Sequence, residues 1–178
     1  MFKKLFGKGQ PPADEDAFAV IRRDYARLLI QPSGRELELA LDSWTWLRPP
    51  KGQPLLVSAF GDMFFRGANG ILMLDTLEGD LRPVAADGFE LRARLAEPEQ
   101  QDELLSSVWV QAAERQGLVL ESGECFDWSV PPALGGRIAV DAITKLSFVV
   151  KADLAGQMHE QIKALPPGTK INRVTISD

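Results

Sequence analysis

Histidine and cysteine are almost absent from this 178-residue sequence, which contains one of each, His159 and Cys125. A zinc site needs three or four nitrogen or sulfur ligands, and these two residues supply at most two of them. A single cysteine forms no internal disulfide, so nothing in the sequence favours an oxidising compartment. We therefore predict a protein that holds no metal ion and no cofactor.

Long apolar stretches are also missing. Runs such as 71–74 and 147–150 are far shorter than the roughly 18 residues that a membrane-spanning helix needs. The first residues, MFKKLFGKGQPP, contain lysines but no apolar core of a secretory signal. These features predict a cytoplasmic protein that does not enter a membrane. Residues 1–13 are expected to form a flexible basic tail ahead of a single domain over 14–178.

Charge is unevenly distributed along the chain. The formal net charge is −5, which disfavours direct binding to nucleic acid. Residues 61–130 contain 14 acidic and five basic side chains, and the densest acidic stretch, 97–103, lies at an expected helix start. Acidic side chains stabilise a helix N-terminus, so a solvated helix explains this stretch. The alternative is a negative surface that binds a basic partner.

The spacing of apolar residues predicts the first elements. An opening helix is expected after Asp14, because apolar residues recur at helical intervals from Phe18 to Leu28. Residues 36–41 alternate leucine with glutamate or alanine, which favours a half-buried strand, although a helix also fits this stretch. Trp44 and Trp46 are interpreted as aromatics of the core or its edge, since this use is commoner than a ligand-stacking platform.

Strands and helices then follow in separate groups. Asn69-Gly70 predicts a hairpin turn, and Gly117 predicts the left-handed end of a long helix. The predicted strands are 55–60, 62–66, 71–75, 81–85, 124–130, 145–150 and 171–176, and the predicted helices are one from Asp87, one over 99–116 and one over 153–165. This grouping predicts an α+β fold, with a twisted antiparallel or mixed sheet flanked by helices.

Residues that carry out catalysis are not evident. Cys125 and His159 suggest a thiol hydrolase only weakly, because Cys125 begins an apolar strand and His159 lies within a helix. Neither a G-x-G-x-x-G after a strand nor a G-x-x-x-x-G-K-[ST] motif occurs, so nucleotide binding has no support. No spacing identifies a facing pair of carboxylates. We predict that the protein is not an enzyme.

Three segments carry a resemblance to a known family. They are FGDMFFRGANGILMLDTLEGDLRPVA, ESGECFDWSVPPALGG and KLSFVVKADLAGQMHEQIKALPPGTKI. In this order and at similar separations, they resemble the C-terminal domain family of type VI secretion DNase-immunity proteins, over about 55–176. Longer members have a GAD-like domain ahead of this region, which residues 14–54 can represent only in abbreviated form. The resemblance implies a fold similar to the SUKH group of toxin-immunity proteins.

The resemblance also implies a function. It predicts an immunity protein that neutralises a cognate toxin, a type VI secretion nuclease effector, by occluding it without catalysis. A nuclease presents a basic face to DNA, and an acidic inhibitor suits such a target. Several acidic residues are candidates for this contact: Asp62, Asp75, Glu78, Asp80, Glu97, Glu99, Asp102 and Glu103. The alternative function is that of a general intracellular protein-binding adaptor on the same scaffold.

Overall fold

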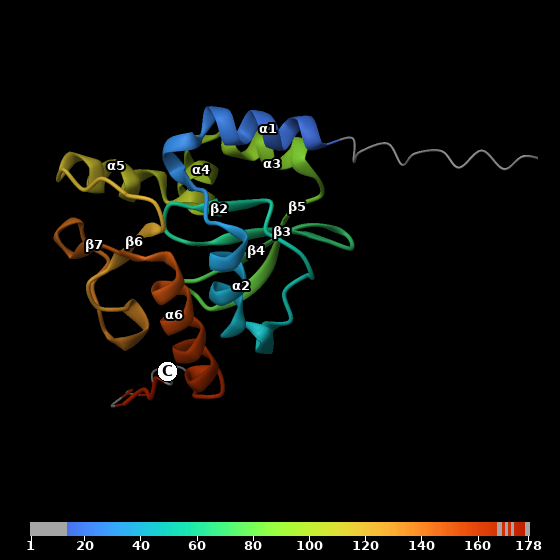
Figure 1. Cartoon of the computed structure of the whole chain (residues 1–178). Coiled ribbons are helices and arrows are strands. Elements are labelled where there is room, and N and C mark those ends of the chain that lie inside the picture. The colour runs from blue at the N-terminus through green and yellow to red at the C-terminus, as the bar shows by residue number, and fades with distance from the viewer. Residues whose placement is uncertain (1–13, 167–168, 170, 172, 177–178) are drawn as a thin grey trace, which may run out of the picture.

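A five-stranded antiparallel sheet forms the centre of the computed structural model, which describes residues 14–166, 169, 171 and 173–176 (Figure 1). The strands follow one another in chain order: β1 (Leu29–Ile30), β2 (Leu56–Ser58), β3 (Met63–Gly67), β4 (Gly70–Asp75) and β5 (Asp80–Ala85). The basic tail predicted over 1–13 lies outside the described residues.

The tightest connection in this sheet is the predicted hairpin between β3 and β4. Gly67 pairs with Gly70, so Ala68 and Asn69 form the turn. Gly70 has φ 134°, a left-handed value that a residue with a Cβ rarely adopts. The predicted hairpin is confirmed, with its turn one residue earlier than the predicted Asn69-Gly70.

A second, two-stranded sheet is formed by β6 (Glu124–Trp128) and β7 (Ile143–Ser147). The N–H group of Phe126 in β6 donates to the carbonyl oxygen of Ala59, just after β2, at 2.8 Å. This hydrogen bond attaches the small sheet to the loop that joins β2 to β3. This contact brings residues far apart in the sequence to the same end of the molecule.

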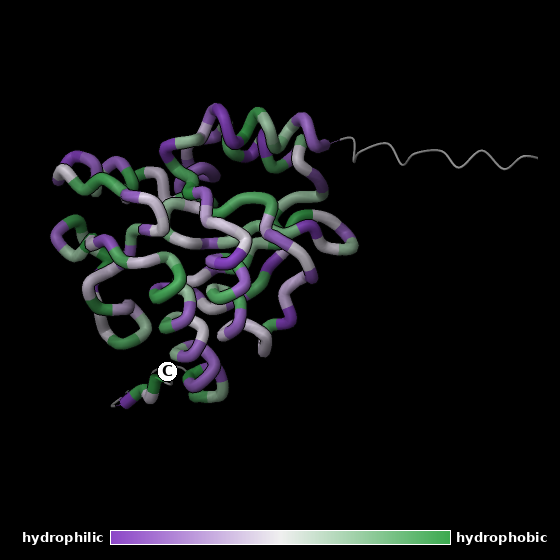
Figure 2. The backbone as a smooth tube through the Cα atoms, in the orientation of Figure 1, coloured by the Kyte–Doolittle hydropathy of each residue, from purple (hydrophilic) through white to green (hydrophobic). Residues whose placement is uncertain are grey.

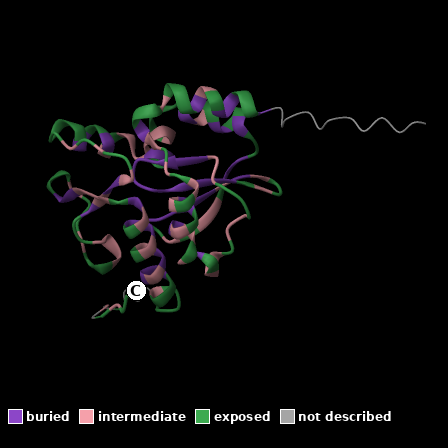
Figure 3. Cartoon of the chain, viewed as in Figure 1, coloured by how far each residue is buried: buried purple, intermediate pink, exposed green. Residues whose placement is uncertain are grey.

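Helices cover both faces of the large sheet (Figure 1). On one face lie α1 (Glu15–Asp24), α3 (Gly88–Leu95), α4 (Pro98–Leu105) and α5 (Ser107–Arg115); on the other lie α2 (Gly34–Asp42) and α6 (Phe148–Ile162). Successive residues of β3 point to opposite faces, so Phe64 packs with the first set and Phe65 with the second. Apolar residues concentrate along the central strands β2, β3 and β4, which are largely buried (Figures 2 and 3).

Residues 36–41 form a helix and not the half-buried strand favoured by their alternating leucines. Ser33 and Glu36 make a capping box, in which Ser33 Oγ accepts from the Glu36 N–H at 3.3 Å and Glu36 Oε2 accepts from the Ser33 N–H at 2.7 Å. Such reciprocal bonds satisfy N–H groups that a helix start leaves unpaired. Leu37 and Ala40 then face the core at helical spacing.

The single helix predicted over 99–116 is two helices, α4 and α5, so this prediction is wrong in part. Ser106 between them adopts a left-handed conformation, with φ 52° and ψ 41°. Asp102 stabilises this break between the helices, because its Oδ1 accepts a hydrogen bond from the N–H group of Val108 at 2.8 Å. Gly117 has φ 79°, which confirms the predicted left-handed residue after the helix.

The C-terminal part differs from the prediction at its boundaries. Helix α6 begins at Phe148 and not at 153, because Ser147 accepts from the Val150 N–H group and starts the helix there. The predicted strand over 145–150 is therefore correct only up to Ser147. No strand is assigned to the described part of the predicted strand 171–176.

The other predicted helices and strands are present with different ends: the opening helix ends at Asp24 and not near Leu28, and the strand predicted over 124–130 ends at Trp128. The predicted α+β fold with antiparallel sheets flanked by helices is confirmed. Trp44 is fully buried and Trp46 partly buried, and their rings stack with centroids 6.0 Å apart, as the core-edge interpretation requires. Across the described ranges, the helices are all too short or too polar to cross a membrane.

Candidate partner-binding cleft

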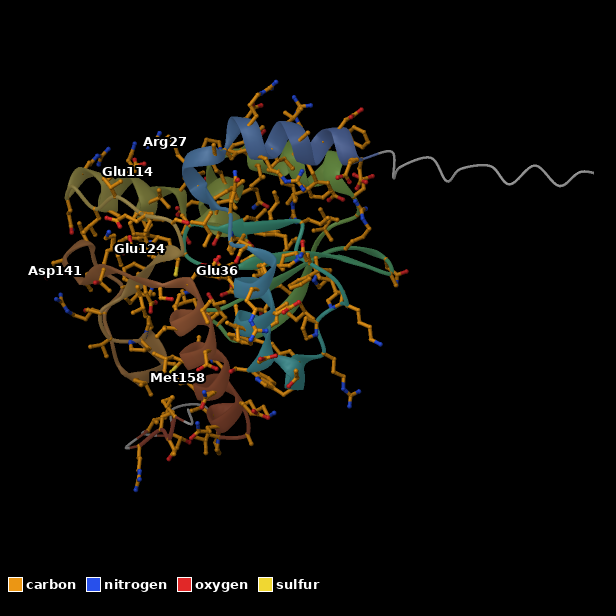
Figure 4. All side chains as sticks on the ribbon, viewed as in Figure 1. Arg27, Glu36, Glu114, Glu124, Asp141 and Met158 are labelled. Atoms are coloured by element: carbon orange, nitrogen blue, oxygen red, sulfur yellow. The ribbon has the colours of Figure 1, made fainter. Side chains whose placement is uncertain are left out.

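A cleft of about 410 Å³ opens between α6, the junction of α4 and α5, and the loop that joins β6 to β7. Its inner end reaches the loop between β2 and β3 and the end of β4. Figure 4 shows Met158, one of the lining residues, on the side of α6 that faces the β6–β7 loop. The cleft therefore lies where the two sheets and three helices meet.

Aromatic side chains form one wall of the cleft. The ring of Trp128 on β6 lies 5.5 Å from that of Phe60 and 5.1 Å, edge to face, from that of Trp109 on α5. The opposite wall comes from α6, through Leu154 and Met158. Most of the exposed wall is apolar, which suits a site that removes apolar surface of a partner from water.

Charged groups lie at the inner end of this apolar cleft. Lys151 of α6 is 6% exposed, and its Nζ donates to the carbonyl oxygen of Phe60 and, at 2.7 Å, to Thr76 Oγ1. Thr76 Oγ1 in turn donates to Asp62 Oδ1 at 2.8 Å, and the Thr76 N–H group donates to the same oxygen at 2.9 Å. Ser58 also donates a hydrogen bond to the Asp62 carboxylate. We call Ser58, Asp62, Thr76 and Lys151 the floor cluster.

The local sequence explains the floor cluster. Gly61 has φ 86° and turns the chain between β2 and β3, so that the carbonyl of Phe60 faces Lys151 and the carboxylate of Asp62 faces Thr76. A Cβ on Gly61 would lie 3.4 Å from Lys151 Cδ and Nζ. The Phe60-Gly61-Asp62 segment, part of the sequence resemblance, therefore builds the inner end of the cleft.

Burial raises the pKa of Asp62 above its ordinary value, against the opposing effect of Lys151. Asp75 raises this pKa further, whereas the hydrogen bonds from Thr76 lower it. Ser58 Oγ donates to Asp62 Oδ2 at 2.9 Å and accepts from the Asp62 N–H group at 3.0 Å. The polar groups of the cluster thus satisfy one another, which suits a structural role in shaping the cleft.

Further carboxylates line the cleft beyond the floor cluster. Asp75 and Glu103 share Arg82, whose guanidinium nitrogens lie 3.7 Å and 3.3 Å from their oxygens. Asp127 of β6 also lines the cleft, and its carboxylate has no hydrogen bond or ion pair with any residue that the structure describes. The carboxylates that line the cleft are those of Asp62, Asp75, Glu103 and Asp127. They lie near two cations, the Lys151 ammonium group and the Arg82 guanidinium, so the cleft has an excess of negative charge.

The structure brings three of the eight predicted acidic residues to this cleft: Asp62 at the floor, and Asp75 and Glu103 on the wall. Asp75 Oδ1 also accepts from the N–H groups of Leu77 and Glu78, both at 3.0 Å, so it shapes the turn that follows β4. Glu78 and Asp80 are exposed beside that turn, outside the cleft lining.

The other three predicted residues, just before α4 or on it, do not line the cleft. Glu97 and Glu99 are exposed at the start of the helix, as expected for an acidic first turn. Asp102 stabilises the start of α5 through Val108. Sequence reasoning missed Asp127 and Lys151, although Asp127 alternates with the buried Phe126 and Trp128, which is the pattern of a strand residue on the other face.

Cys125 and His159 do not form a reactive pair at this site. Cys125 is fully buried in the core with Trp44 and Phe148, and burial raises the pKa of its thiol to about 12. A thiol with such a pKa is protonated at neutral pH and is a poor nucleophile. Burial also lowers the pKa of His159, and neither residue lines the cleft. The core interpretation of Cys125 is confirmed.

The described residues also contain no group of three or more histidine, cysteine, aspartate or glutamate side chains that could hold a metal ion. The acidic residues of the cleft are therefore spread around an apolar wall and do not converge on one point.

Comparison with known families gives one match. The family model described as T6SS immunity protein Tdi1, C-terminal, matches residues 88–159, from the start of α3 to His159 on α6. This part of the chain is similar to type VI secretion immunity proteins, as its sequence motifs predicted, over a shorter range than the predicted 55–176. The matched residues include the wall residues Trp109, Asp127 and Trp128 and the floor residue Lys151. No curated protein matches the chain, and no solved structure does.

Proposed function

We propose that this protein binds one cognate toxin, a nuclease effector of a type VI secretion system, and neutralises it by occlusion in the cytoplasm of the cell that makes both. The match of residues 88–159 to a type VI immunity family is the observation that carries this proposal. An immunity protein protects by staying bound, so its affinity and its slow dissociation matter more than any turnover.

The charge of the chain suits a nuclease target. A nuclease needs a basic surface to hold the phosphates of DNA, and this chain has a net charge of −5 with most of its excess acid over 61–130. Opposite charges speed the encounter of two proteins, and an acidic protein competes with phosphate for the same basic face. We therefore expect the association of the chain with the toxin to slow as the salt concentration increases.

The internal chemistry supports binding without catalysis. The Cys125 thiol is buried in the core, and the floor cluster satisfies its own polar groups. A residue that attacks a substrate needs a free, activated side chain next to a base. The side chains at the inner end of the cleft are instead used to hold the β2–β3 loop against α6.

Co-expression with the toxin tests this function. The effector encoded beside this gene is expressed in a sensitive bacterium, alone and with the chain, and growth and DNA integrity are measured. Protection and co-purification at low salt are expected, with weaker association at high salt. Undiminished killing, with no complex formed by the folded chain, would show that the proposed function is wrong.

A matched control uses an effector whose nuclease active site has been inactivated. This effector should still co-purify with the chain, because occlusion needs its surface and not its activity. If the chain removed toxicity by modifying or degrading the effector, mass spectrometry would show an altered effector, and the occlusion mechanism would be incorrect.

A further inference from the structure

We propose that the cleft receives an arginine side chain carried on an apolar segment of the partner, and that this insertion anchors the complex. This inference rests on the proposed function for the identity of the partner, the toxin. The cleft offers an apolar wall to the segment and carboxylates to the guanidinium.

Apolar side chains line the walls and the mouth of the cleft. Trp109 is partly exposed beside Trp128, and Leu134, Ile138 and Leu154 are 39%, 47% and 36% exposed around the opening. Apolar side chains gathered around one recess indicate a surface that is covered when a partner binds. Large side chains that enter such a recess dominate the binding energy of many interfaces.

The chain itself shows which kind of segment fits the opening. Val174 and Ile176, near the C-terminus, both line the cleft. Between them, Thr175 is fixed by Gln161 of α6, which donates from Nε2 to the Thr175 carbonyl at 2.7 Å and accepts at Oε1 from its N–H group at 3.0 Å. Aliphatic side chains on either side of a backbone held in this way already occupy part of the wall. A partner segment with apolar residues on both sides of its arginine presents aliphatic side chains like those of Val174 and Ile176.

Carboxylates outnumber cations in and beside the cleft. Lys151 is held by Phe60 and Thr76, and Arg82 is shared by Asp75 and Glu103. These two cations leave the four lining carboxylates with an excess of two negative charges. Asp127, which lacks an ionic partner among the described residues, is the carboxylate most available to a new cation.

Arginine fits this environment better than lysine. Its planar guanidinium can stack on a tryptophan face while it donates two parallel hydrogen bonds to a carboxylate. Trp109, Asp127 and Trp128 all line the cleft, and Trp109 packs against Trp128 from α5. An ammonium group makes a point contact and is more costly to remove from water, so a lysine peptide should bind less tightly.

A peptide experiment tests the cleft without the toxin. The probe is acetyl-Leu-Arg-Leu-amide, compared with the same peptide containing citrulline, which has the shape of arginine without its charge, and with the lysine peptide. The indole N–H signals of Trp109 and Trp128 are followed by NMR. The arginine peptide should shift both signals and bind at least about tenfold more tightly than the citrulline peptide. Equal binding of both peptides, or shifts confined to other residues, would overturn the inference.

Two variants locate the effect at the cleft. Asp127→Asn removes the available carboxylate, and Leu134→Lys places a positive charge at the mouth. Each should weaken binding of the arginine peptide at least about tenfold. The matched control is Glu38→Gln, an equal change of charge on α2, where the side chain is 73% exposed and pairs with Arg35. Thermal unfolding of every variant verifies that it is folded.

The same variants separate this inference from the proposed function. If wild-type protein binds the toxin and Asp127→Asn and Leu134→Lys bind it at least tenfold more weakly, both stand. If the toxin binds all variants equally, the cleft inference is wrong and the proposed function is unaffected. If wild type binds the arginine peptide but no toxin, the proposed function is wrong and the preference of the cleft for arginine is supported.

Discussion

Two buried carboxylates join distant parts of this chain in different ways. Asp62 belongs to the floor cluster at the inner end of the cleft. Asp14, just before α1, accepts from Arg66 Nη1 and Nη2 at 3.0 and 2.9 Å and from the Gly88 N–H group at 2.8 Å. We call Asp14, Arg66 and Gly88 the N-terminal cluster. Each cluster connects three segments that are far apart in sequence.

The two carboxylates have pKa shifts of opposite sign. Direct hydrogen bonds from Arg66 lower the pKa of Asp14, whereas burial raises the pKa of Asp62. The cation nearest to Asp62 is Lys151, which reaches it through the Thr76 hydroxyl. Asp62 lies deeper than Asp14 and meets its cation only through Thr76, so depth of burial and the geometry of the cation together separate the two pKa values.

The surroundings of the two clusters differ as well. Next to the N-terminal cluster, the Arg66 guanidinium lies 5.6 Å from the centre of the Phe18 ring, and a Cβ on Gly88 would lie 2.7 Å from Phe18 Cε2. This tight packing fastens α1 and α3 to the sheet. The floor cluster instead borders an open cleft of about 410 Å³. The N-terminal cluster holds two helices against the sheet, whereas the floor cluster forms one end of the cleft.

The largest effect is expected when the floor cluster loses its cation. Lys151→Met keeps the length of the side chain but leaves Asp62, Thr76 and the Phe60 carbonyl without the ammonium group. Removing one partner from a buried charged network costs about 3–5 kcal/mol. Urea unfolding measures this loss. The double variant with Asp62→Asn should recover part of it, and a loss below about 1 kcal/mol would show that Lys151 is not a structural member of the cluster.

The pH dependence of stability should distinguish the two carboxylates. Because folding lowers the pKa of Asp14, its contribution is present above its ordinary value of 3.8 and is lost as pH falls through the lowered value. Because folding raises the pKa of Asp62, its contribution is present below 3.8 and is lost as pH rises through the raised value.

Urea unfolding of Asp14→Asn and Asp62→Asn between pH 3 and 7 tests these signs, with wild type measured alongside. The stability difference between wild type and Asp14→Asn should shrink as pH falls, and that between wild type and Asp62→Asn should shrink as pH rises. Parallel curves for the two variants would contradict the comparison of the clusters.

Glycine substitutions should separate close packing from backbone strain. Gly88→Ala places a Cβ 2.7 Å from Phe18 Cε2 and 3.1 Å from the Asp14 carbonyl oxygen, and such overpacking costs about 1–3 kcal/mol. Gly61→Ala meets Lys151 only at 3.4 Å, so its cost is that of the left-handed backbone, about 1–2 kcal/mol. Phe18→Leu should relieve Gly88→Ala and leave Gly61→Ala unchanged in double-variant unfolding experiments. Equal relief of both would contradict this distinction.

The smallest effect is expected at the mouth of the cleft. Glu103 is half exposed and pairs with Arg82, which also faces Asp75. Glu103→Gln should therefore change the free energy of unfolding by less than about 0.5 kcal/mol. A loss above about 1 kcal/mol in urea would show that the mouth, like the floor, stabilises the fold.

The sequence predicted the elements whose patterns come from local chemistry. The β3–β4 hairpin follows from glycine at Gly70, and the end of α5 follows from Gly117. The strand prediction at 36–41 failed because alternation over six residues also fits a helix, and the capping box of Ser33 and Glu36 decides between them. The break at Ser106 carries no local signal, since a left-handed serine is rarely favourable by itself.

The candidate site was only partly predictable. The charge imbalance indicated an acidic surface, but residues near in sequence, such as Glu97 and Glu103, lie on different parts of the molecule relative to the cleft. Asp127 is one carboxylate among many in the sequence. Only the folded structure places it in the lining of the same cleft as Trp109, which packs from α5 against Trp128.

The sequence by itself determined the composition, the local turns, the α+β class and the motifs that resemble type VI immunity proteins, because these depend on residue types and short spacings. Only the tertiary structure decided that Asp62, Thr76 and Lys151 form one floor, and that Asp75, Glu103 and Asp127 surround one cleft. The contacts of Lys151 with Phe60 and Thr76 join residues 91 and 75 positions apart. Their meeting depends on how the helices pack on both faces of the sheet, which no local pattern specifies.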